Sequence, residues 1–529
     1  MVQNGKASDT LIDQIATRIG KAHVLSDEDS CSFYSQDVFT KANAAVAVVQ
    51  PANTEELAEC VRIATQLGYD VIPRGGGMSY TSGYVPSTSN AVIFDLSRMN
   101  RILEINTEDM YVTAECGVTW KELYEALKDT AYRTPYWGTL SGSKATIGGG
   151  LSQNSIFWGS GLYGSAADNV IGLEVVLVDG SIVKTGSGAQ LNSQPFFRHY
   201  GPDLTGLFTC DAGALGFKAS ATIRLIKQSK GQQFCAFDFK TGEDAIAAMS
   251  EIARRSLAAE CFGFDPLLQK QRLKRESLSK DVKALAGVMK ASGSVVGALK
   301  DGAKVALAGR RYMDEVDHSV QIMVEDYCQA GADAKAKEIS AIAKQHKGRE
   351  IENSIPKITR ANPFGPVNSM VGPNGERWVP SHVLTSHSKA VGSYQAILDL
   401  FDSHKAAFDK FNIETGFLYA TISTNCFVLE PVFFWPDALT EIHQRSVEAA
   451  HLSKLTPYPE DIAARKLVAQ VRSEFSDMFR ERGGVHLQIG KAYRYADGIA
   501  PESLALIKSI KQTLDPHNQV NPGALGMDK

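Results

Sequence analysis

Two glycine-rich passages, at residues 73–83 and 142–154, constrain the fold of this chain more than any other feature. The first reads PRGGGMSYTSG and the second reads GSKATIGGGLSQN. Because glycine has no Cβ, the backbone N–H groups of such loops can converge on the oxygens of a phosphate group. Either loop alone also fits a tight turn, but two of them in one half of the chain favour a diphosphate. We therefore expect a dinucleotide ligand.

The order of the predicted elements around these loops differs from that of a Rossmann fold. The first loop follows a predicted amphipathic helix at 55–67 and a buried strand at 69–73. The second loop instead comes before a predicted hairpin at 171–183, with an Asp-Gly turn. A Rossmann fingerprint needs a strand, then glycines, then a helix, so the glycines at 159–164 do not form one.

Further motifs follow in the order found in a known family. They are RGGG, ATIGGGLSQN, GLEVVLVDGSIVKTG and DLTGLFTCDAGALGF within residues 44–226, and LDPHNQVNPGAL at 514–525. With these motifs the chain resembles the vanillyl-alcohol oxidase and p-cresol methylhydroxylase family, whose relatives include D-lactate and D-2-hydroxyglutarate dehydrogenases. The resemblance implies an α+β fold, in which an FAD-binding domain of two αβ subdomains carries a cap domain built on an antiparallel sheet.

The length of the chain agrees with more than one domain, because 529 residues exceed one ordinary hydrophobic core. We expect the FAD-binding domain at 1–228, the cap or substrate domain at 229–480, and a closing segment at 481–529 that returns to the FAD domain. The polar stretch QSKGQQ marks the first boundary, and strand-like and helical segments alternate after it.

The resemblance implies FAD as the cofactor, and we expect it to be bound without a covalent link. Many family members tether the flavin through a histidine, but the corresponding positions here hold Met78 and Cys426. A link through Cys426 is the alternative, although the apolar strand around it favours a plain buried cysteine. The expected FAD contacts are Pro73, Arg74, Gly75, Gly76, Gly77, Met78, Ser79, Leu140, Ser141, Ser143, Thr146, Gly149, Asn154, Gly161, Gly216 and Asn521.

The stretch HLQIGKAYRYADG at 486–498 offers the clearest candidates for substrate chemistry. Its polar residues alternate, which predicts that several of them share one face of a strand and turn. The vanillyl-alcohol oxidase branch carries a Tyr-Arg dipeptide here that binds the substrate as a phenolate, and Tyr493 and Arg494 match it. Charge-assisted hydrogen bonds from these groups lower the pKa of a phenol, which eases hydride loss from the para benzylic carbon. A Tyr-Arg pair is also common on protein surfaces.

His486 is the third candidate catalytic residue and has two interpretations. In the D-2-hydroxyacid dehydrogenase branch a histidine here acts as a base, and the glutamate before it helps to hold a divalent metal. This chain has Val485 in place of that glutamate, and its STNCF stretch at 423–427 lacks a metal-binding histidine of that branch. We therefore expect no metal, which favours an aromatic substrate over lactate or hydroxyglutarate. A buried histidine with one backbone partner is an equally good interpretation.

Flat side chains of the cap are candidates for the wall of an aromatic pocket. Phe and Trp in a strand are core residues in most proteins, which is the competing interpretation. The vanillyl-alcohol oxidase branch also has an aspartate near the flavin N5, where this chain has Leu140 and Ser141, so its substrate does not carry over directly. The expected substrate contacts are Tyr80, Trp378, His382, Phe433, Trp435 and Gln488.

These features predict an FAD-dependent oxidase or dehydrogenase. It would transfer a hydride from a benzylic or alcohol carbon of a phenolic, lignin-derived type of compound to flavin N5, with oxygen or a redox protein as electron acceptor. The enzyme alternative is a D-2-hydroxyacid dehydrogenase that acts on lactate or glycolate. The non-enzyme alternative is a flavin-binding protein without turnover.

Composition limits the partners. A net charge of −4 gives no electrostatic case for nucleic acid. We expect a cytoplasmic protein, because no signal peptide or membrane-spanning run is evident, and we expect it to be a homodimer. The eight cysteines include no CxxC pair, so the sequence suggests neither a zinc ribbon nor an iron-sulfur site. The segment at 274–311, rich in Lys, Ala and Gly, fits either a membrane-surface helix or a solvated insertion in the cap. Its lack of Trp and Phe favours the insertion.

Overall fold

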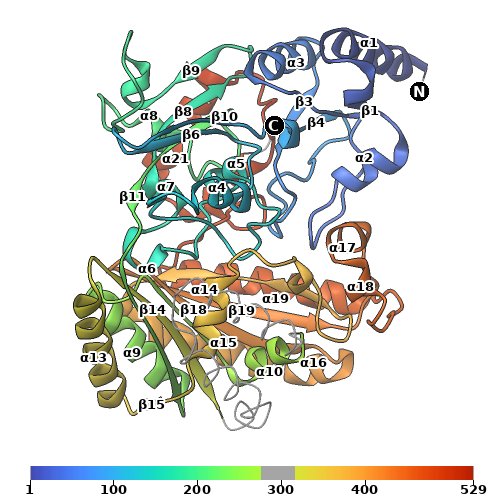
Figure 1. Ribbon diagram of the computed structural model, residues 1–529. Helices are drawn as coiled ribbons and strands as arrows, with labels where there is room; N and C mark the ends of the chain where they lie inside the picture. The colour runs from blue at the N-terminus through green and yellow to red at the C-terminus, as the bar shows by residue number, and fades with distance from the viewer. Residues whose placement is uncertain (1, 276–315, 528–529) are drawn as a thin grey trace. The chain divides into compact units, whose positions relative to one another are not determined.

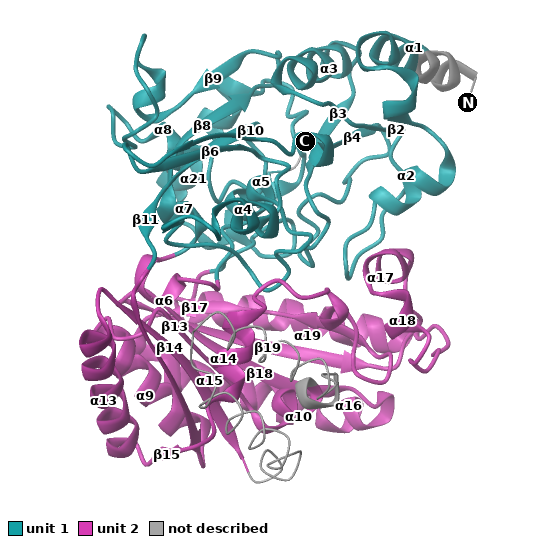
Figure 2. Cartoon of the chain, in the orientation of Figure 1, with its two compact units in different colours: residues 1–156, 165–228, 486–529 teal, residues 157–164, 229–485 magenta. Residues whose placement is uncertain are grey.

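The computed structural model describes residues 2–275 and 316–527, which form two compact units (Figures 1 and 2). Apart from its first two residues, the segment at 274–311 lies outside the described residues. Unit 1 is built from three stretches of chain, and unit 2 from two. The stretches of unit 1 are Met1–Ile156, Ser165–Gln228 and His486–Lys529, and those of unit 2 are Phe157–Gly164 and Ser229–Val485.

The first subdomain of unit 1 is a four-stranded sheet in the order β1-β2-β4-β3, which is parallel apart from β1. Helices α1 and α3 share a hydrophobic core with this sheet, in which Leu11, Leu57 and Val71 are fully buried. Asn53 caps α3, because its side chain accepts a hydrogen bond from the Glu56 N–H. The bounds are α1 Val2–Ile19, β1 Val24–Leu25, α2 Glu28–Tyr34, β2 Ala47–Val49, α3 Thr54–Gln66, β3 Asp70–Arg74 and β4 Ala91–Asp95.

The second subdomain of unit 1 is a five-stranded antiparallel sheet in the order β5-β6-β10-β8-β9. The predicted hairpin is confirmed as β8–β9, in which Val176 pairs with Ile182 across a turn containing Gly180 at φ 81°. The bounds are β5 Ile102–Asn106, β6 Tyr111–Glu115, α4 Trp120–Leu127, β7 Tyr132–Arg133, α5 Ile147–Ser152, α7 Ala166–Asn169, β8 Val170–Val176, β9 Ile182–Lys184, α8 Leu204–Leu207, β10 Phe217–Arg224, β11 Ile226–Lys227, α20 Tyr495–Gly498 and α21 Pro501–Leu514.

Unit 2 is a sheet in the order β15-β12-β14-β13-β18-β19-β16, with β17 also paired to β19, and all of these pairings are antiparallel. Helices α9, α13 and α15 pack against it (Figure 1). The antiparallel cap sheet with flanking helices was predicted from the sequence. The bounds are α6 Ser160–Tyr163, β12 Gly231–Phe239, α9 Gly242–Arg254, β13 Glu260–Phe264, α10 Pro266–Arg275, β14 His318–Asp326, α13 Gln329–Gln345, β15 Arg349–Glu350, α14 Ser354–Ala361, β16 Arg377–Pro380, β17 Val383–Thr385, α15 His387–Ser403, α16 Lys405–Phe411, β18 Glu414–Ile422, β19 Cys426–Trp435, α17 Glu441–Ser446, α18 Ala449–Leu452 and α19 Ile462–Glu481.

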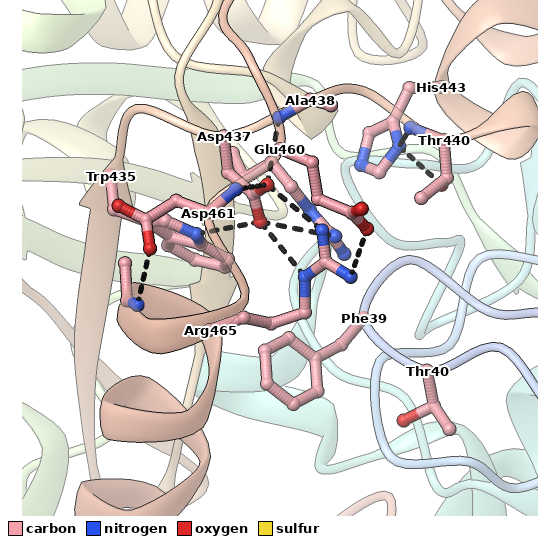
Figure 3. A network of polar contacts seen from close by, with 12 residues as sticks. Phe39, Thr40, Trp435, Asp437, Ala438, Thr440, His443, Glu460, Asp461 and Arg465 are labelled. Atoms are coloured by element: carbon pink, nitrogen blue, oxygen red, sulfur yellow. Dashed lines mark hydrogen bonds and ion pairs between the residues drawn. The ribbon is translucent and has the colours of Figure 1, made fainter.

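A buried carboxylate, Asp437, ties the end of β19 to β16 and α19 (Figure 3). Its two oxygens accept hydrogen bonds from Nε and Nη2 of Arg465, both at 2.9 Å, and Nη1 of Arg377 lies at 3.6 Å. The Trp435 indole N–H donates to the same carboxylate at 3.1 Å. Burial by itself raises the pKa of this carboxyl, but these donors and the Asp461 N–H hold the pKa of Asp437 below its ordinary value.

Replacing Asp437 with alanine is expected to destabilise unit 2 by about 3 to 5 kcal/mol, because two guanidinium groups lose their shared buried partner. The measurement is the free energy of unfolding in urea, followed by tryptophan fluorescence. Asp409→Ala is the matched control, because Asp409 also pairs with a cation, Lys405, but its side chain is 65% exposed. The control should change stability by less than about 0.5 kcal/mol. Equal effects of the two substitutions would contradict the assigned role of Asp437.

Candidate cofactor site and neighbouring side chains

The first glycine passage leaves a row of backbone donors unused. Within the described part of the chain, the N–H groups of residues 75–79 donate no hydrogen bond. A Cβ on Gly76 would lie 1.8 Å from the Lys144 carbonyl oxygen, and one on Gly75 would lie 2.3 Å from the Thr146 hydroxyl. The two glycine passages therefore pack directly against each other. Because unpaired N–H groups are rare in native proteins, five successive ones indicate an anion-binding loop.

The second glycine passage opens the short helix α5, which corrects the prediction of glycines followed only by a hairpin. Thr146 is the N-cap of this helix. The backbone N–H of Trp120, the first residue of α4, donates to the Ala145 carbonyl at 3.1 Å and so links the passage to α4. A Cβ on Gly148 would come within 2.8 Å of Cys116, and one on Gly150 within 2.8 Å of Trp120. Close packing therefore requires glycine at both positions.

Asn521 of the closing segment links the first glycine passage to a third loop, which contains Ala212. Its amide nitrogen donates to the carbonyl oxygens of Gly83 and Ala212, each at 2.8 Å. The Ala212 N–H in turn donates to Ser152 O at the end of α5 at 2.9 Å. Ala212 adopts a left-handed φ of 51°, a strained conformation for a residue with a Cβ, and such strain is common at binding sites.

Unit 1 contains every predicted FAD contact except Gly161, which lies in unit 2. There the Gly161 N–H donates to Ala259 O at 2.9 Å, and a Cβ would come within 2.5 Å of the Ala258 carbonyl oxygen. Tight packing inside unit 2 therefore accounts for a glycine at 161. The predicted contacts in unit 1 are Pro73, Arg74, Gly75, Gly76, Gly77, Met78, Ser79, Leu140, Ser141, Ser143, Thr146, Gly149, Asn154, Gly216 and Asn521.

The loop at residues 37–40 also supports the first glycine passage, and it was not predicted from the sequence. The buried carboxylate of Asp37 accepts hydrogen bonds from the N–H groups of Thr40 and Ser82, both at 2.6 Å, and of Phe39 at 2.9 Å. The Val38 N–H also donates to Ser79 O at 3.1 Å. In the sequence, the only sign of this loop is Asp37 itself. Its side chain accepts hydrogen bonds from the N–H groups two and three residues later, as is typical of an Asx turn.

The closing segment brings its candidate catalytic residues to the same unit as the glycine passages. The Gln488 N–H donates to Gln153 O at 2.8 Å, and the Lys491 N–H donates to Thr81 O at 2.9 Å. Each glycine passage therefore holds one end of the stretch before Tyr493.

Within this stretch, the rings of His486 and Tyr493 are stacked, with centroids 4.0 Å apart and planes at 9°. Tyr493 is buried, whereas Arg494 is exposed at the N-cap of α20. The predicted strand with alternating polar residues is wrong, because the chain forms turns from 486 to 494. His486 and Tyr493 meet through a reversal of the chain.

The predicted aromatic wall of the cap lies on two faces of the unit 2 sheet. Phe433 packs on Phe401 of α15 and Phe475 of α19, at 5.7 and 6.0 Å between ring centroids, so it belongs to the helix-covered core. Trp435, two residues on, points to the same face. Trp378 pairs with Phe434 and therefore points to the opposite face. His382 is buried in unit 2, and Tyr80 is buried in unit 1.

Three side chains of β19 share a face with Trp378 and were not predicted from the sequence as site residues. Phe434 is the cross-strand partner of Trp378, and Val432 and Glu430 point to the same side farther along β19. Glu430 is half-buried in an otherwise apolar strand. Side chains alternate between the two faces along β19, so the residues that share a face with Trp378 can be identified once the register of the sheet is known.

Three other features bear on the predictions of flavin attachment, metal binding and membrane contact. Burial raises the pKa of the Cys426 thiol to about 12, which keeps it protonated at neutral pH. Over residues 2–275 and 316–527, no cluster of three or more His, Cys, Asp or Glu side chains is arranged to hold a metal ion. Over the same residues, no helix is long and apolar enough to cross a membrane.

Comparisons with known proteins agree with a cofactor site at the glycine passages. Residues 45–186 match the family model described as FAD binding domain. An uncharacterized FAD-linked oxidoreductase of Escherichia coli strain K12, YgcU, is 30% identical over 262 residues, which cover 47% of this chain and 52% of that protein. The D-lactate dehydrogenase of Archaeoglobus fulgidus is 32% identical over 215 residues, which cover 40% of this chain and 45% of that protein. The chain thus spans about half the length of the curated relatives it matches.

Among solved structures, p-cresol methylhydroxylase with bound substrate matches with a TM-score of 0.73 at 17% identity, covering 99% of this chain and 97% of that one. This match confirms the predicted α+β fold with a cap built on an antiparallel sheet. Residues 45–186 therefore form an FAD binding domain, with FAD as the cofactor, on a fold shared with p-cresol methylhydroxylase.

Proposed function

We propose that this protein is an FAD-linked oxidoreductase. The observation that carries the proposal is the attachment of the His486–Tyr493 stack to both glycine passages, through Gln488 and Lys491. The unused N–H groups of residues 75–79 suit the diphosphate of FAD, and the closing segment places candidate substrate-binding groups in the same unit. FAD, when bound, accepts the hydride, and the chain's own residues bind and orient the substrate.

The substrate that we propose is a phenolic compound with a benzylic or alcohol carbon to be oxidised. Tyr493 is buried, and the His486 ring holds its orientation. Arg494 directly follows Tyr493, and in the proposed complex the tyrosine hydroxyl and the guanidinium both donate to one phenol oxygen. Both groups stabilise the phenolate and lower the pKa of the phenol, and the added electron density weakens the bond to the departing hydride. The full-length likeness to p-cresol methylhydroxylase supports this choice.

A second candidate is oxidation of a D-2-hydroxy acid. The 32% identity to a D-lactate dehydrogenase supports it, as does the presence of His486 where that branch has its base. Val485, however, replaces the glutamate that helps to hold the metal in that branch. The non-enzyme alternative, a flavin-binding protein without turnover, is decided by the same experiment.

The test is anaerobic reduction of the bound flavin by a panel of compounds. We expect a phenolic benzylic alcohol to bleach the flavin absorbance near 450 nm within the order of a second, the usual range of enzyme turnover. D-lactate should leave the flavin oxidised, and a chelator should not change the rate with the phenol. Fast, chelator-sensitive reduction by D-lactate would establish the second candidate. No reduction by either compound would leave only the non-enzyme alternative.

The mode of FAD attachment gives a further prediction. Met78 has no proton to lose on forming a link to the flavin, unlike a histidine or cysteine, and the Cys426 thiol stays protonated at neutral pH, so we expect FAD to be held by non-covalent contacts alone. Heat denaturation followed by centrifugation should leave intact FAD in the supernatant. Flavin that remains in the precipitate would contradict the prediction, and its loss in a Cys426→Ser variant would identify the attachment point.

Replacing Arg494 with methionine tests the phenolate mechanism. We expect flavin reduction by phenols to slow by roughly two to four powers of ten, which corresponds to a charged donor worth about 3 to 5 kcal/mol. The measurement is stopped-flow reduction at saturating phenol. FAD content should not change, because Arg494 is exposed at the start of α20 and the glycine passages are intact.

Two controls accompany this variant. Arg482→Met removes an exposed arginine that donates to the Gly392 carbonyl in unit 2, and it should reduce its flavin at the normal rate. Tyr493→Phe keeps the ring that stacks on His486 and should slow reduction less, since a neutral donor contributes less than a guanidinium. The mechanism is wrong if Arg494→Met is as fast as wild type and a methyl ether of the phenol is oxidised as fast as the free phenol.

A further inference from the structure

Among the residues that the structure describes, Arg74 is a buried cation without a counter-ion. It ends β3, immediately before the first glycine passage, and is only 6% exposed. Within the described chain, no carboxylate lies within ion-pair distance of its guanidinium, and its Nε has no hydrogen-bond acceptor. Its single hydrogen bond is long, at 3.3 Å from Nη1 to Gly75 O. Burial of an unpaired charge is costly, so the position calls for an anion that is not part of the chain.

Two acidic residues near this part of the chain, Asp95 and Asp37, already have other partners. Asp95 is the neighbour of Arg74 in the β3–β4 pairing, but its carboxylate accepts hydrogen bonds from the Tyr34 hydroxyl, Gln50 Nε2 and the Ser97 hydroxyl, each at 2.9 Å. The carboxylate of Asp37 is occupied by three backbone N–H groups. Neither acid neutralises the guanidinium directly.

Three aromatic rings hold the guanidinium in place. Its central carbon lies 4.4 Å from the ring centroid of Tyr34, 5.2 Å from that of Tyr84 and 5.6 Å from that of Phe33. Aromatic faces attract a cation without neutralising its charge, and they keep water away from it. We call these three residues the aromatic cage of Arg74.

The cage holds the guanidinium against the backbone of the first glycine passage. A Cβ added to Gly77 would lie 2.5 Å from Nη2 of Arg74, so the guanidinium touches the backbone of the glycine passage. The Tyr84 hydroxyl donates to Gly77 O at 2.9 Å, which links the cage to the same residue. A charge in these water-poor surroundings acts strongly on an anion on the other side of the passage.

We propose that Arg74, positioned by Phe33, Tyr34 and Tyr84, supplies the fixed positive charge that attracts the FAD diphosphate to the first glycine passage. The N–H groups of residues 75–79 give the diphosphate its hydrogen bonds, and Arg74 gives it a counter-charge from behind. The proposal rests on the proposed function only in its choice of FAD as the ligand. If the proposal is right, loss of the Arg74 charge weakens the binding of flavins that carry a diphosphate and does not change the binding of a flavin without phosphate.

The test compares FAD with riboflavin, which carries the same ring system but no phosphate. Apo-protein of wild type and of Arg74→Met is titrated with each ligand, and flavin fluorescence gives the two dissociation constants. We expect Arg74→Met to bind FAD about 10- to 100-fold more weakly and riboflavin within about twofold of wild type. The melting temperature of the Arg74→Met apo-protein should be no lower than that of wild type, because an unpaired buried charge has been removed.

Three further variants keep the result interpretable. Arg74→Lys keeps the charge and should retain most of the preference for FAD over riboflavin. Arg74→Gln replaces Arg74→Met if the latter does not fold. Arg472→Met is the matched control, because Arg472 is a 9% exposed arginine in unit 2, far from the glycine passages in sequence. Its loss should lower the melting temperature and leave both dissociation constants unchanged.

The outcomes separate this inference from the proposed function. If wild type binds FAD no better than riboflavin, the assignment of FAD to the glycine passages fails. If wild type prefers FAD and the neutral variants keep the same preference, only the role of Arg74 is overturned. An equal loss of both ligands with a lower melting temperature would make Arg74 a packing residue and would also overturn the inference.

Discussion

The backbone hydrogen bonds from the closing segment to the two glycine passages are the interactions on which the rest of the site depends. Through Gln488 and Lys491 they join residues near 490 to the loops that end near 83 and 154. The side chain of Asn521 adds two more bonds, to Gly83 and Ala212. Without this contact, the cofactor loops would lack one wall, and Tyr493 would have no fixed place beside them. The glycine passages and the residues proposed to bind substrate therefore share one hydrogen-bonded framework in unit 1.

Folding and ligand binding make the same demands on the glycine passages. At Gly75 and Gly76, a side chain would collide with the second passage before any ligand arrived. At Gly77 the obstacle would be Arg74, so in the proposed site the loop backbone separates a buried charge from the diphosphate. Substitution at these positions therefore disturbs the fold and the site together. The charge of Arg74 can be altered more selectively, because its side chain lies behind the loop.

Local patterns in the sequence predicted the parts of this structure that local chemistry decides. The Asp-Gly turn of the β8–β9 hairpin and the antiparallel sheet of unit 2 were both predicted. Helix α5 was missed, because six residues with three glycines show no helical periodicity and the helix depends on the Thr146 cap. The opposite faces of Trp378 and Phe433 follow from a register that partners distant in sequence impose. The stack of His486 on Tyr493 depends on turns that no periodic pattern encodes.

The division of unit 1 into distant stretches also sets an order of events during synthesis. Val520 pairs with Val71 of β3, so the sheet that leads into the first glycine passage lacks this neighbour until residue 520 leaves the ribosome. Unit 2, which ends at Val485, has its whole sequence available earlier. Its strands can pair while the cofactor loops still wait for the closing segment. The chain therefore gains the capacity to bind flavin only after the whole sequence of unit 2 has been synthesised.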